Sequence, residues 1–352
     1  MMRDNKILIC FNEPTKYYSN YLGKEVGNET DENDLSEREF LKQIDSIKKI
    51  LSKKYSSVET LPINSDVRSA IKKITLYSPD AIFNFVESIE GNSNYESYIA
   101  GVFDLLRIQY TGNSAITLGN CLVKSRTKQI LQSHGVRTPL HFLAQVNQFP
   151  SKNEFKLKFP VILKLAREDA SIGISEFSVV RNLEEMNQRL AYLFNSFNQE
   201  VIIEEYIDGR ELNVAILGNE ILPISEITFD TLPDGLPKIV TYEAKWSEES
   251  VYFKSTIPKC PAQLDSQLEQ KIKQMAYSAY DAMECRDYAR VDIRLNSKNV
   301  PYVIEVNPNP DISPDTGFVR SAKAAGISYD ELLYRISTFA LKRNLYDSQA
   351  AS

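Results

Sequence analysis

The sequence predicts a multidomain α/β protein whose later part is α+β. In the first third, apolar strand-like segments alternate with helical patterns, which is typical of a parallel sheet covered on both faces. From Arg210 onward strand-like segments dominate, which indicates antiparallel pairing. A length of 352 residues leaves room for two or three hydrophobic cores.

Three domains are expected, over residues 1–115, 116–208 and 209–352. In the first, strands are predicted at 6–11, 58–63 and 81–86, with helices at 40–51 and 95–107. In the second, helices are predicted at 122–134 and 183–194, with strands at 161–166, 176–180 and 201–207. In the third, the predicted elements are strands at 211–217, 221–229 and 239–245, a helix at 264–284, a hairpin at 288–310 and a helix at 329–341.

Composition excludes several classes of protein. A net charge of −6 argues against a general nucleic-acid binder, although a local basic pocket for a small anion remains compatible with it. Four scattered cysteines and two histidines fit neither a zinc site nor a disulfide framework. The absence of a signal peptide and of a membrane-length apolar run predicts a cytoplasmic protein with no membrane partner.

The hairpin carries the first candidate site. Antiparallel pairing of its strands places Asp292, Glu305 and Asn307 on one face, together with Arg290 and Arg294. Two carboxylates and an amide oxygen are hard ligands, suited to Mg²⁺ that is shared with substrate phosphates. The alternative interpretation is a solvated face of an ordinary hairpin.

A lysine inside an apolar strand marks a second candidate site. Burying an unpaired ammonium is costly, so Lys164 needs an anionic partner such as a phosphate, unless its strand is an edge strand that lets it reach water. The following loop contains Ala170, Ser171 and Gly173, small residues that allow backbone N–H groups to approach a phosphate. This loop lacks the Walker ending and the GxGxxG pattern.

The segment 202–211 is the third candidate. Its strand gives way to a turn at Asp208-Gly209, and a second strand opens with Glu211. Such a crossover would offer backbone groups to an adenine edge and a carboxylate to a ribose hydroxyl. The alternative is a common surface turn with solvated acids.

With these pieces in order, the chain resembles the D-alanine–D-alanine ligase family of ATP-grasp ligases over residues 79–341. The motifs that carry the resemblance are Tyr110-Thr-Gly112, Glu204-Glu-Tyr-Ile-Asp-Gly-Arg-Glu211, Tyr242-Glu-Ala-Lys245, Arg290-Val-Asp292, Glu305-Val-Asn-Pro308 and Ala324-Ala-Gly-Ile-Ser-Tyr329. The resemblance implies an ATP-grasp fold of three domains, with ATP between the second and the third. It also implies a weak expectation of a homodimer.

The resemblance assigns a role to each candidate residue. The residues implied in nucleotide binding are Lys124 and Lys164 at the phosphates, Ser171, Ile172 and Gly173 in the phosphate loop, Glu204, Glu205 and Ile207 at the adenine hinge, Glu211 at the ribose and Lys245 at the γ-phosphate. Asp292, Glu305 and Asn307 would hold two Mg²⁺ ions, for which Mn²⁺ is an alternative. The residues implied in catalysis are Arg290 at the oxyanion, with Lys245 and Ser171.

The substrate side departs from the family pattern, while the ATP and metal positions are intact. Glu13 stands in a segment that replaces the family's Gly-Gly…Glu, Glu90 replaces a histidine, and Thr316 beside Gly317 replaces a serine that binds the acceptor carboxylate. Ala170, Trp246 and Asp311 replace a serine, a tyrosine and a glycine. These changes remove the link that the family uses between lid and substrate pocket. Our hypothesis is that the substrate pair has changed, and compensated drift is the alternative.

The predicted function is an ATP-dependent carboxylate–amine ligase that joins two small molecules through an acyl phosphate, releasing ADP and phosphate. One alternative is an ATP-grasp enzyme that acts on a non-amino-acid scaffold or phosphorylates a small molecule. A second alternative, from another class, is a non-catalytic ATP-binding module. That module would have to explain why Arg290, the three metal ligands and the phosphate lysines are all retained.

Overall fold

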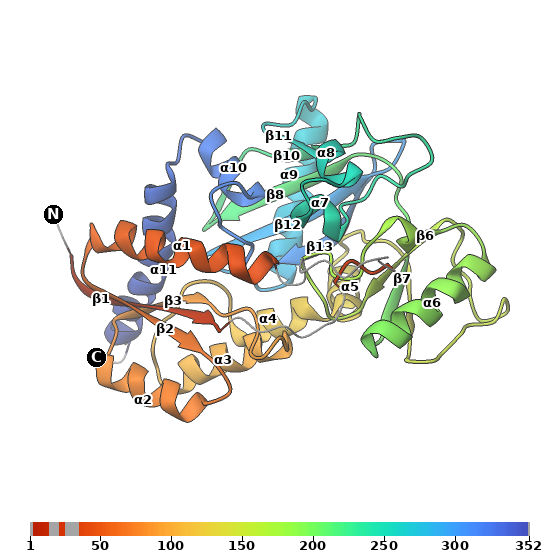
Figure 1. Cartoon of the computed structure of the whole chain (residues 1–352). Coiled ribbons are helices and arrows are strands. Elements are labelled where there is room, and N and C mark those ends of the chain that lie inside the picture. Colours follow the sequence, from red (N-terminus) through yellow and green to blue (C-terminus); the bar gives the residue numbers. More distant parts are fainter. Residues whose placement is uncertain (1–2, 14–20, 25–34, 351–352) are drawn as a thin grey trace.

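The computed structural model describes residues 3–13, 21–24 and 35–350, and these residues form three β-sheets (Figure 1). The first sheet is parallel, with the order β2-β1-β3, and consists of β1 (Arg3–Asn12), β2 (Tyr55–Ile63) and β3 (Ala81–Phe85). Its helices are α1 (Leu35–Ser52), α2 (Val67–Tyr77) and α3 (Asn94–Leu105). The parallel sheet predicted for the first third of the chain is confirmed.

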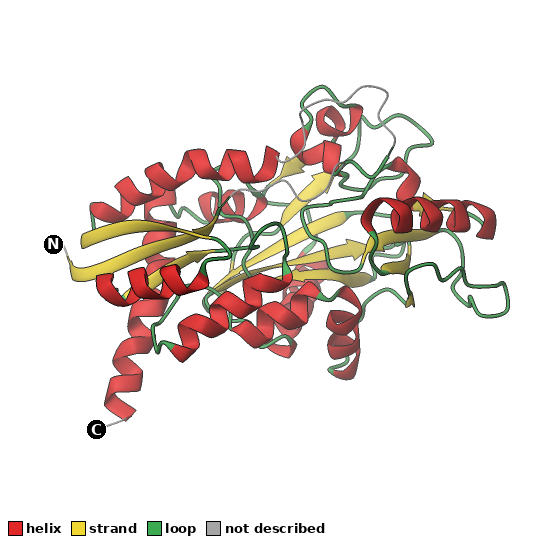
Figure 2. Cartoon of the chain, turned by 60° about the horizontal axis from the view of Figure 1, so that its bottom comes forward, coloured by secondary structure: helices red, strands yellow, loops and turns green. Residues whose placement is uncertain are grey.

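Both faces of the first sheet are buried, because apolar residues occupy successive positions of β1. Ile7 and Ile9 pack in one core with α1 and with α11 (Tyr329–Ala350), whereas Leu8 and Cys10 pack in another with α2 and α3. Figure 2 shows helices on both sides of this sheet. The C-terminal helix therefore returns to cover the N-terminal sheet.

Helix α2 was not predicted from the sequence. It begins after Asp66, whose side chain accepts a hydrogen bond from the backbone N–H of Ser69, and it ends at Ser78 in a left-handed conformation. Its apolar residues, Val67, Ala70, Ile71, Ile74 and Tyr77, recur at helical spacing, so the sequence carried a signal for this helix that the prediction overlooked.

The second sheet is antiparallel, with the order β4-β7-β5-β6. Its strands are β4 (His141–Ala144), β5 (Val161–Leu165), β6 (Val179–Val180) and β7 (Val201–Glu205), and the helices nearby in sequence are α4 (Ala115–Leu122), α5 (Lys124–Ser133) and α6 (Leu183–Phe197). The strand predicted at 176–180 is wrong in its first half. There Ser175 and Ser178 exchange side-chain-to-backbone hydrogen bonds and cap the 3₁₀ turn Glu176–Ser178.

The third sheet is also antiparallel, with the order β11-β10-β8-β12-β13 and β9 paired to β8. Its strands are β8 (Glu211–Leu217), β9 (Glu220–Ile221), β10 (Ser225–Thr228), β11 (Ile257–Lys259), β12 (Tyr288–Leu295) and β13 (Pro301–Asn307). Helix α9 (Ser266–Ala282) packs on it through Ile272 and Ala276. The strand predicted at 221–229 is interrupted between β9 and β10, where Pro223 lacks the N–H that a strand ladder needs.

The strand predicted at 239–245 is a helix for its second half, and this prediction was wrong. Thr241 caps α7 (Tyr242–Trp246) by accepting a hydrogen bond from the N–H of Ala244 at 3.1 Å. Helix α8 (Val251–Ser255) follows. Helix α10 (Gly317–Ala324), also unpredicted, lies between the hairpin and α11.

The hairpin register predicted from the alternating pattern is confirmed. Arg290 pairs with Asn307 and Asp292 with Glu305, and the pairing then shifts between Asp292 and Ile293. Cross-strand partners in an antiparallel sheet project from the same face, so these four side chains lie together.

The division into three domains stays a prediction, because α11 belongs by sequence to the third domain and by packing to the first sheet. Within the described part of the chain, none of the helices has the length and apolar character to cross a membrane.

Candidate active site

Asp292 is the centre of the predicted hairpin site. Its side chain is buried, and Arg290 binds it through two hydrogen bonds of 2.7 and 2.8 Å. Asn213 of β8 and Asn307 of β13 also donate to its oxygens, at 2.7 and 3.0 Å. Three neighbouring strands therefore place their donors on one carboxylate.

Lys124 joins this cluster to the phosphate loop. Its ammonium lies 3.0 Å from both Glu305 and Asp169, and it donates to the carbonyl of Glu168 at 2.6 Å. Burial opposes the charge of Lys124, but the two carboxylates outweigh this effect and raise its pKa. Burial also opposes the charge of Glu305, which by itself would raise the pKa of this carboxyl. The positive charges of Lys124 and Lys164 outweigh burial and hold the pKa of Glu305 well below its usual range.

Lys164, the other lysine expected at the phosphates, belongs to a chain of three charged side chains with Glu204 and Lys128. Glu204 lies 3.1 Å from Lys164 on one oxygen and 3.1 Å from Lys128 on the other, and Lys128 and Glu204 are each 1% exposed. Lys128 also donates to the hydroxyl of Thr138 and the carbonyl of Ile304. Burial raises the pKa of Glu204, but the two lysines outweigh it and lower the pKa below its ordinary value.

The crossover predicted at 202–211 is organised by Arg294. This guanidinium donates to the carbonyls of Ile207 and Gly209 at 2.7 and 3.0 Å and to the carboxylate of Glu211 at 2.9 Å. Glu211 is buried, and burial raises its pKa despite the arginine. At the other end of the hinge, Glu205 accepts from the N–H of Leu140 at 3.2 Å. Arg294 hydrogen-bonds to the hinge, and the expectation that it places positive charge beside a metal ion stays a prediction.

The loop predicted to bind phosphate follows β5 and has an unusual backbone. Ala170, Ser171 and Gly173 all have left-handed conformations, with φ of 53°, 63° and 72°. The N–H of Ile172 donates to the carbonyl of Asp169, and the N–H of Ile174 to that of Ser171. These turns keep the loop tight where it passes Lys124.

Lys245 reaches this region from α7. Its side chain is exposed to solvent, yet the surrounding protein lowers the pKa of its ammonium, and the charge of Arg290 lowers it further. The charges of Glu305 and Asp292 act in the opposite direction. Lys245 therefore belongs electrostatically to the same cluster as the hairpin residues.

The predicted substrate residues lie around the edge of this cluster, and not all of them reach it. Glu13 is exposed and accepts a hydrogen bond from Asn64 at 2.8 Å, while Glu90 is exposed in a turn with a left-handed backbone. The hydroxyl of Thr316 donates to carbonyls of its own loop. A Cβ added at Gly317, where α10 begins, would lie 3.6 Å from the Oδ1 of Asn213, so this helix terminus lies beside the Asp292 cluster.

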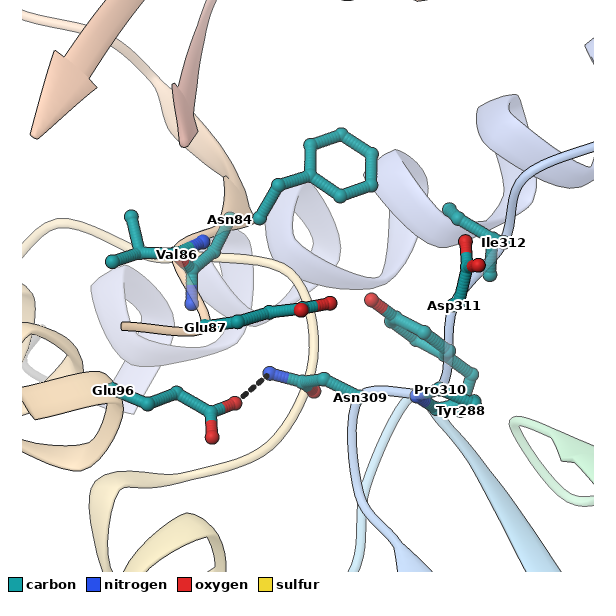
Figure 3. A pocket seen from close by; sticks show the side chains of 10 residues that line it. Asn84, Val86, Glu87, Glu96, Tyr288, Asn309, Pro310, Asp311 and Ile312 are labelled. Atoms are coloured by element: carbon teal, nitrogen blue, oxygen red, sulfur yellow. Dashed lines mark hydrogen bonds between the residues drawn. The ribbon is translucent and has the colours of Figure 1, made fainter. Parts of the chain in front are cut away.

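A small cavity of about 10 Å³, which opens to solvent, lies between the first sheet and the loop after β13 (Figure 3). Its wall includes Glu87 and Glu96 on one side and Tyr288 and Asp311 on the other. Glu96 accepts a hydrogen bond from Asn309 at 3.4 Å. Burial and the negative charges of Glu87 and Asp169 raise the pKa of Glu96 well above its ordinary value.

Sequence reasoning missed three residues that organise the site, namely Lys128, Asn213 and Arg189. Lys128 stands four residues after Lys124 on one helix face, and a second lysine at that spacing was an available signal. Asn213 alternates with Glu211 along β8, but nothing local indicates its partner across the sheet. Arg189 occupies a helix whose other features suggest only a buried face.

Comparisons with known proteins agree with the family that the motifs indicate. A family model described as D-ala D-ala ligase C-terminus matches residues 136–338. A D-alanine–D-alanine ligase of Carboxydothermus hydrogenoformans is 30% identical over 322 residues, which cover 87% of this chain and 95% of that protein. An uncharacterized protein of Sinorhizobium fredii is 32% identical over 74% of this chain and 75% of its own length.

The fold is shared with a solved structure of D-alanine–D-alanine ligase from Bacillus anthracis complexed with ATP. The TM-score is 0.72 at 24% sequence identity, over 97% of this chain and 99% of that chain. The predicted ATP-grasp fold is thereby confirmed. With the family match and the relatives at 30% identity or more, the chain belongs to the D-alanine–D-alanine ligase family of ATP-grasp ligases.

Proposed function

We propose that this chain is a carboxylate–amine ligase that uses ATP to join two small molecules through an acyl phosphate. The observation that carries the proposal is the convergence of Lys124, Lys245, Arg290, Asp292 and Glu305 from four separate elements, α5, α7, β12 and β13. A surface hairpin would leave Asp292 and Glu305 solvated. Instead, one carboxylate holds an arginine in two hydrogen bonds and the other holds a lysine.

ATP is proposed to bind between the second and third sheets. Lys124 and Lys164 would contact its phosphates, the loop Ser171–Ile172–Gly173 would cover them, and Lys245 would reach the γ-phosphate. The adenine would lie against the hinge of Glu204, Glu205 and Ile207, with Glu211 at the ribose. Support comes from the carboxylates that hold these lysines, because they keep the ammonium groups oriented until phosphate oxygens replace them.

The residues present fit divalent metal ions that are shared with a nucleotide. No group of three His, Cys, Asp or Glu side chains that could hold an ion occurs in the described chain, but Mg²⁺ is usually bound by one or two carboxylates together with substrate phosphates. Asp292, Glu305 and Asn307 supply such hard oxygen ligands on one face. When bound there, two Mg²⁺ ions (or Mn²⁺) would neutralise the charge that develops on the transferring phosphoryl group.

The proposed reaction has two steps. An oxygen of the carboxylate substrate attacks the γ-phosphorus of ATP, the bond to the bridging oxygen breaks, and an acyl phosphate and ADP result. The amine then attacks the acyl carbon, loses a proton, and expels phosphate to leave an amide. Arg290 would donate to the oxyanion of the second step, a contribution of about 3–4 kcal/mol for a donor of this kind.

The substrate pair is proposed to differ from two D-alanine molecules. The departures Glu13, Glu90 and Asp311 lie on the substrate side, and Asp311 stands in the wall of the cavity in Figure 3. Thr316 and Gly317 remain the candidate contacts for the acceptor carboxylate, at the N-terminus of α10. Compensated drift within the family's usual activity is the alternative.

The test is phosphate release from ATP with Mg²⁺ against pooled D- and L-amino acids, followed by mass spectrometry of the products. Release that depends on a pool other than D-alanine, with a new amide product, is the expected result. Robust activity with D-alanine alone would overturn the altered substrate pair and leave the ligase. Binding of ATP with no stimulated turnover in any pool would favour a non-catalytic module.

A homodimer and a cytoplasmic location complete the proposal. The homodimer rests only on the family resemblance. Analytical ultracentrifugation at micromolar concentration tests it, and a single species at the monomer mass of 40.1 kDa would refute it.

A further inference from the structure

The segment Tyr21–Lys24, far from the phosphate loop in sequence, lies directly against that loop. The N–H of Gly173 donates to the carbonyl of Tyr21 at 2.9 Å. Just after the loop, the hydroxyl of Ser175 donates to the carbonyl of Gly23 at 3.2 Å. Two carbonyls of the segment thus accept hydrogen bonds from the loop and from the residue that follows it.

The backbones of the two segments are in close contact at Gly23 and Gly173. A Cβ placed on Gly23 would lie 2.4–2.6 Å from the Cα, carbonyl carbon and oxygen of Gly173. Gly23 also has a left-handed backbone, with φ of +70°. Only glycine meets both conditions at this position.

Arg189 of α6 hydrogen-bonds to both segments, Tyr21–Lys24 and the phosphate loop. Its guanidinium donates to the carbonyl of Gly23 and to that of Gly173, each at 2.6 Å, and to the hydroxyl of Ser178 at 3.1 Å. Its side chain is buried, and burial lowers its pKa. A buried guanidinium needs such partners, so the two carbonyls and the arginine hold one another in place.

The same segment also contacts the helix that carries Lys245. The ring of Tyr21 stacks on Tyr242 with 5.9 Å between ring centroids, and Trp246 packs against this pair. Lys24 lies 2.8 Å from Glu243 of α7 and 3.3 Å from Glu176, which follows the phosphate loop. One short segment therefore touches both the loop and the helix.

We propose that Tyr21–Lys24 is a strap that holds the phosphate loop and α7 in one arrangement, with Arg189 as the positioning residue that anchors it. The inference rests on the proposed function of this loop and of Lys245. The strap takes the place of the link that Ala170 and Trp246 can no longer make, since Trp246 now packs against the apolar cluster that Tyr21 and Leu22 of the strap form with Tyr242. It would keep the loop over the phosphates and exclude water from the acyl phosphate.

The decisive variant is Gly23→Ala, with Gly135→Ala as its matched control. Both glycines have nearly the same left-handed backbone, with φ of +70° and +73°, so both substitutions introduce the same backbone strain. A Cβ at Gly135 has open space around it, whereas one at Gly23 collides with Gly173. A difference between the two variants therefore reports the contact with the loop.

Trp246 is the single tryptophan of the chain, so its fluorescence reports on the strap. In the full-length protein without nucleotide, Gly23→Ala is expected to shift the emission to longer wavelength. It is also expected to accelerate amide exchange over 171–176 and 242–246 by about tenfold, because exchange rates follow local opening. Gly135→Ala should change neither, and identical spectra and exchange for the two variants would overturn the strap.

Titration with Mg²⁺-ATP separates this inference from the proposed function. Gly23→Ala should weaken ATP binding by about tenfold relative to Gly135→Ala, in keeping with the cost of misplacing a binding group. If the unmodified chain binds no ATP, the proposed function fails, while the emission and exchange measurements still decide whether the strap exists.

A charge exchange provides a second variant in case Gly23→Ala does not fold. Lys24→Glu would place a third carboxylate beside Glu176 and Glu243 and should release the strap, with the same changes in emission and exchange. The double variant Lys24→Glu/Glu243→Lys restores one pair and should recover most of the protection. A single variant with unchanged exchange over 242–246 would contradict the proposal.

Arg189→Lys tests the positioning role. It keeps the positive charge but removes the fork that reaches both carbonyls. Exchange over 171–176 should rise and ATP binding weaken, while α6 itself stays protected. If α6 loses protection to the same extent as the loop, the residue is only structural and its assignment as the anchor is wrong.

Discussion

The side of the site predicted to bind nucleotide and the side predicted to bind substrate treat their carboxylates in opposite ways. Glu204 lies between Lys128 and Lys164, and these charges lower its pKa against the effect of burial. Glu96 lines the cavity near Glu87, and burial together with negative neighbours raises its pKa. The first arrangement orients two ammonium groups toward the anionic ligand that is proposed to bind there. In the second arrangement, the surroundings of Glu96 disfavour the ionised form of its carboxyl group.

This contrast distinguishes the residues proposed for the ATP reaction from those proposed to recognise the substrates. Paired charges on the nucleotide side make a preorganised site whose geometry does not depend on which substrates are joined. The acids around the cavity hold lighter contacts, such as the hydrogen bond from Asn309 to Glu96 and those from Ser313 to Asp311, and Asp311 is itself one of the departures from the family pattern. The difference agrees with the proposal that the ATP chemistry of the family is kept and the substrate pair has changed.

The largest expected effect tests the paired side. Lys128→Met removes one partner of a buried ion pair, and we expect it to cost about 3–5 kcal/mol of unfolding free energy, as for other broken buried pairs. Lys271→Met, at an exposed lysine, is the control. Urea denaturation measures both, and a loss below about 1 kcal/mol for Lys128→Met would show that the pair is not an organising feature.

The next effect distinguishes two arginines on one face of β12. Arg290→Lys should lower turnover by about 10²–10³, because one oxyanion donor and the two-point contact with Asp292 are lost. Arg294→Lys should instead raise the KM for ATP, because Arg294 organises the hinge through Ile207, Gly209 and Glu211. Steady-state kinetics with the substrates found by the phosphate-release screen measures both. A loss of turnover shared equally by the two variants would remove the distinction.

The smallest effect concerns the acid of the cavity. Because the pKa of Glu96 is raised on folding, its ionisation destabilises the folded chain as the pH rises through that pKa. Glu96→Gln should therefore gain stability at pH 8 relative to pH 4, by at most about 1 kcal/mol for a partly exposed group. Thermal unfolding at the two pH values measures this, with the exposed Glu248→Gln as control. An equal gain at both pH values would contradict the assignment.

Local patterns predicted the parts of the fold whose partners are close in sequence. The alternating residues of 288–294 and 302–307 predicted the hairpin and the face that holds Asp292, Glu305 and Asn307. The same rule failed at 239–245, where the side chain of Thr241 caps a short helix that periodicity does not reveal. It also failed at 176–178, the first half of the strand predicted at 176–180, where serine side chains bond to the backbone and turn the chain.

The sequence by itself determined the class of chemistry, because motif residues and strand alternation depend on neighbours within a few positions. Only the tertiary structure decided which charges meet. Lys128 pairs with Glu204, Arg294 bonds to the hinge, and Gly23 lies against Gly173 only after distant segments pack together. Burial makes each of these contacts strong, and burial is a property of the assembled sheets and helices rather than of any one segment.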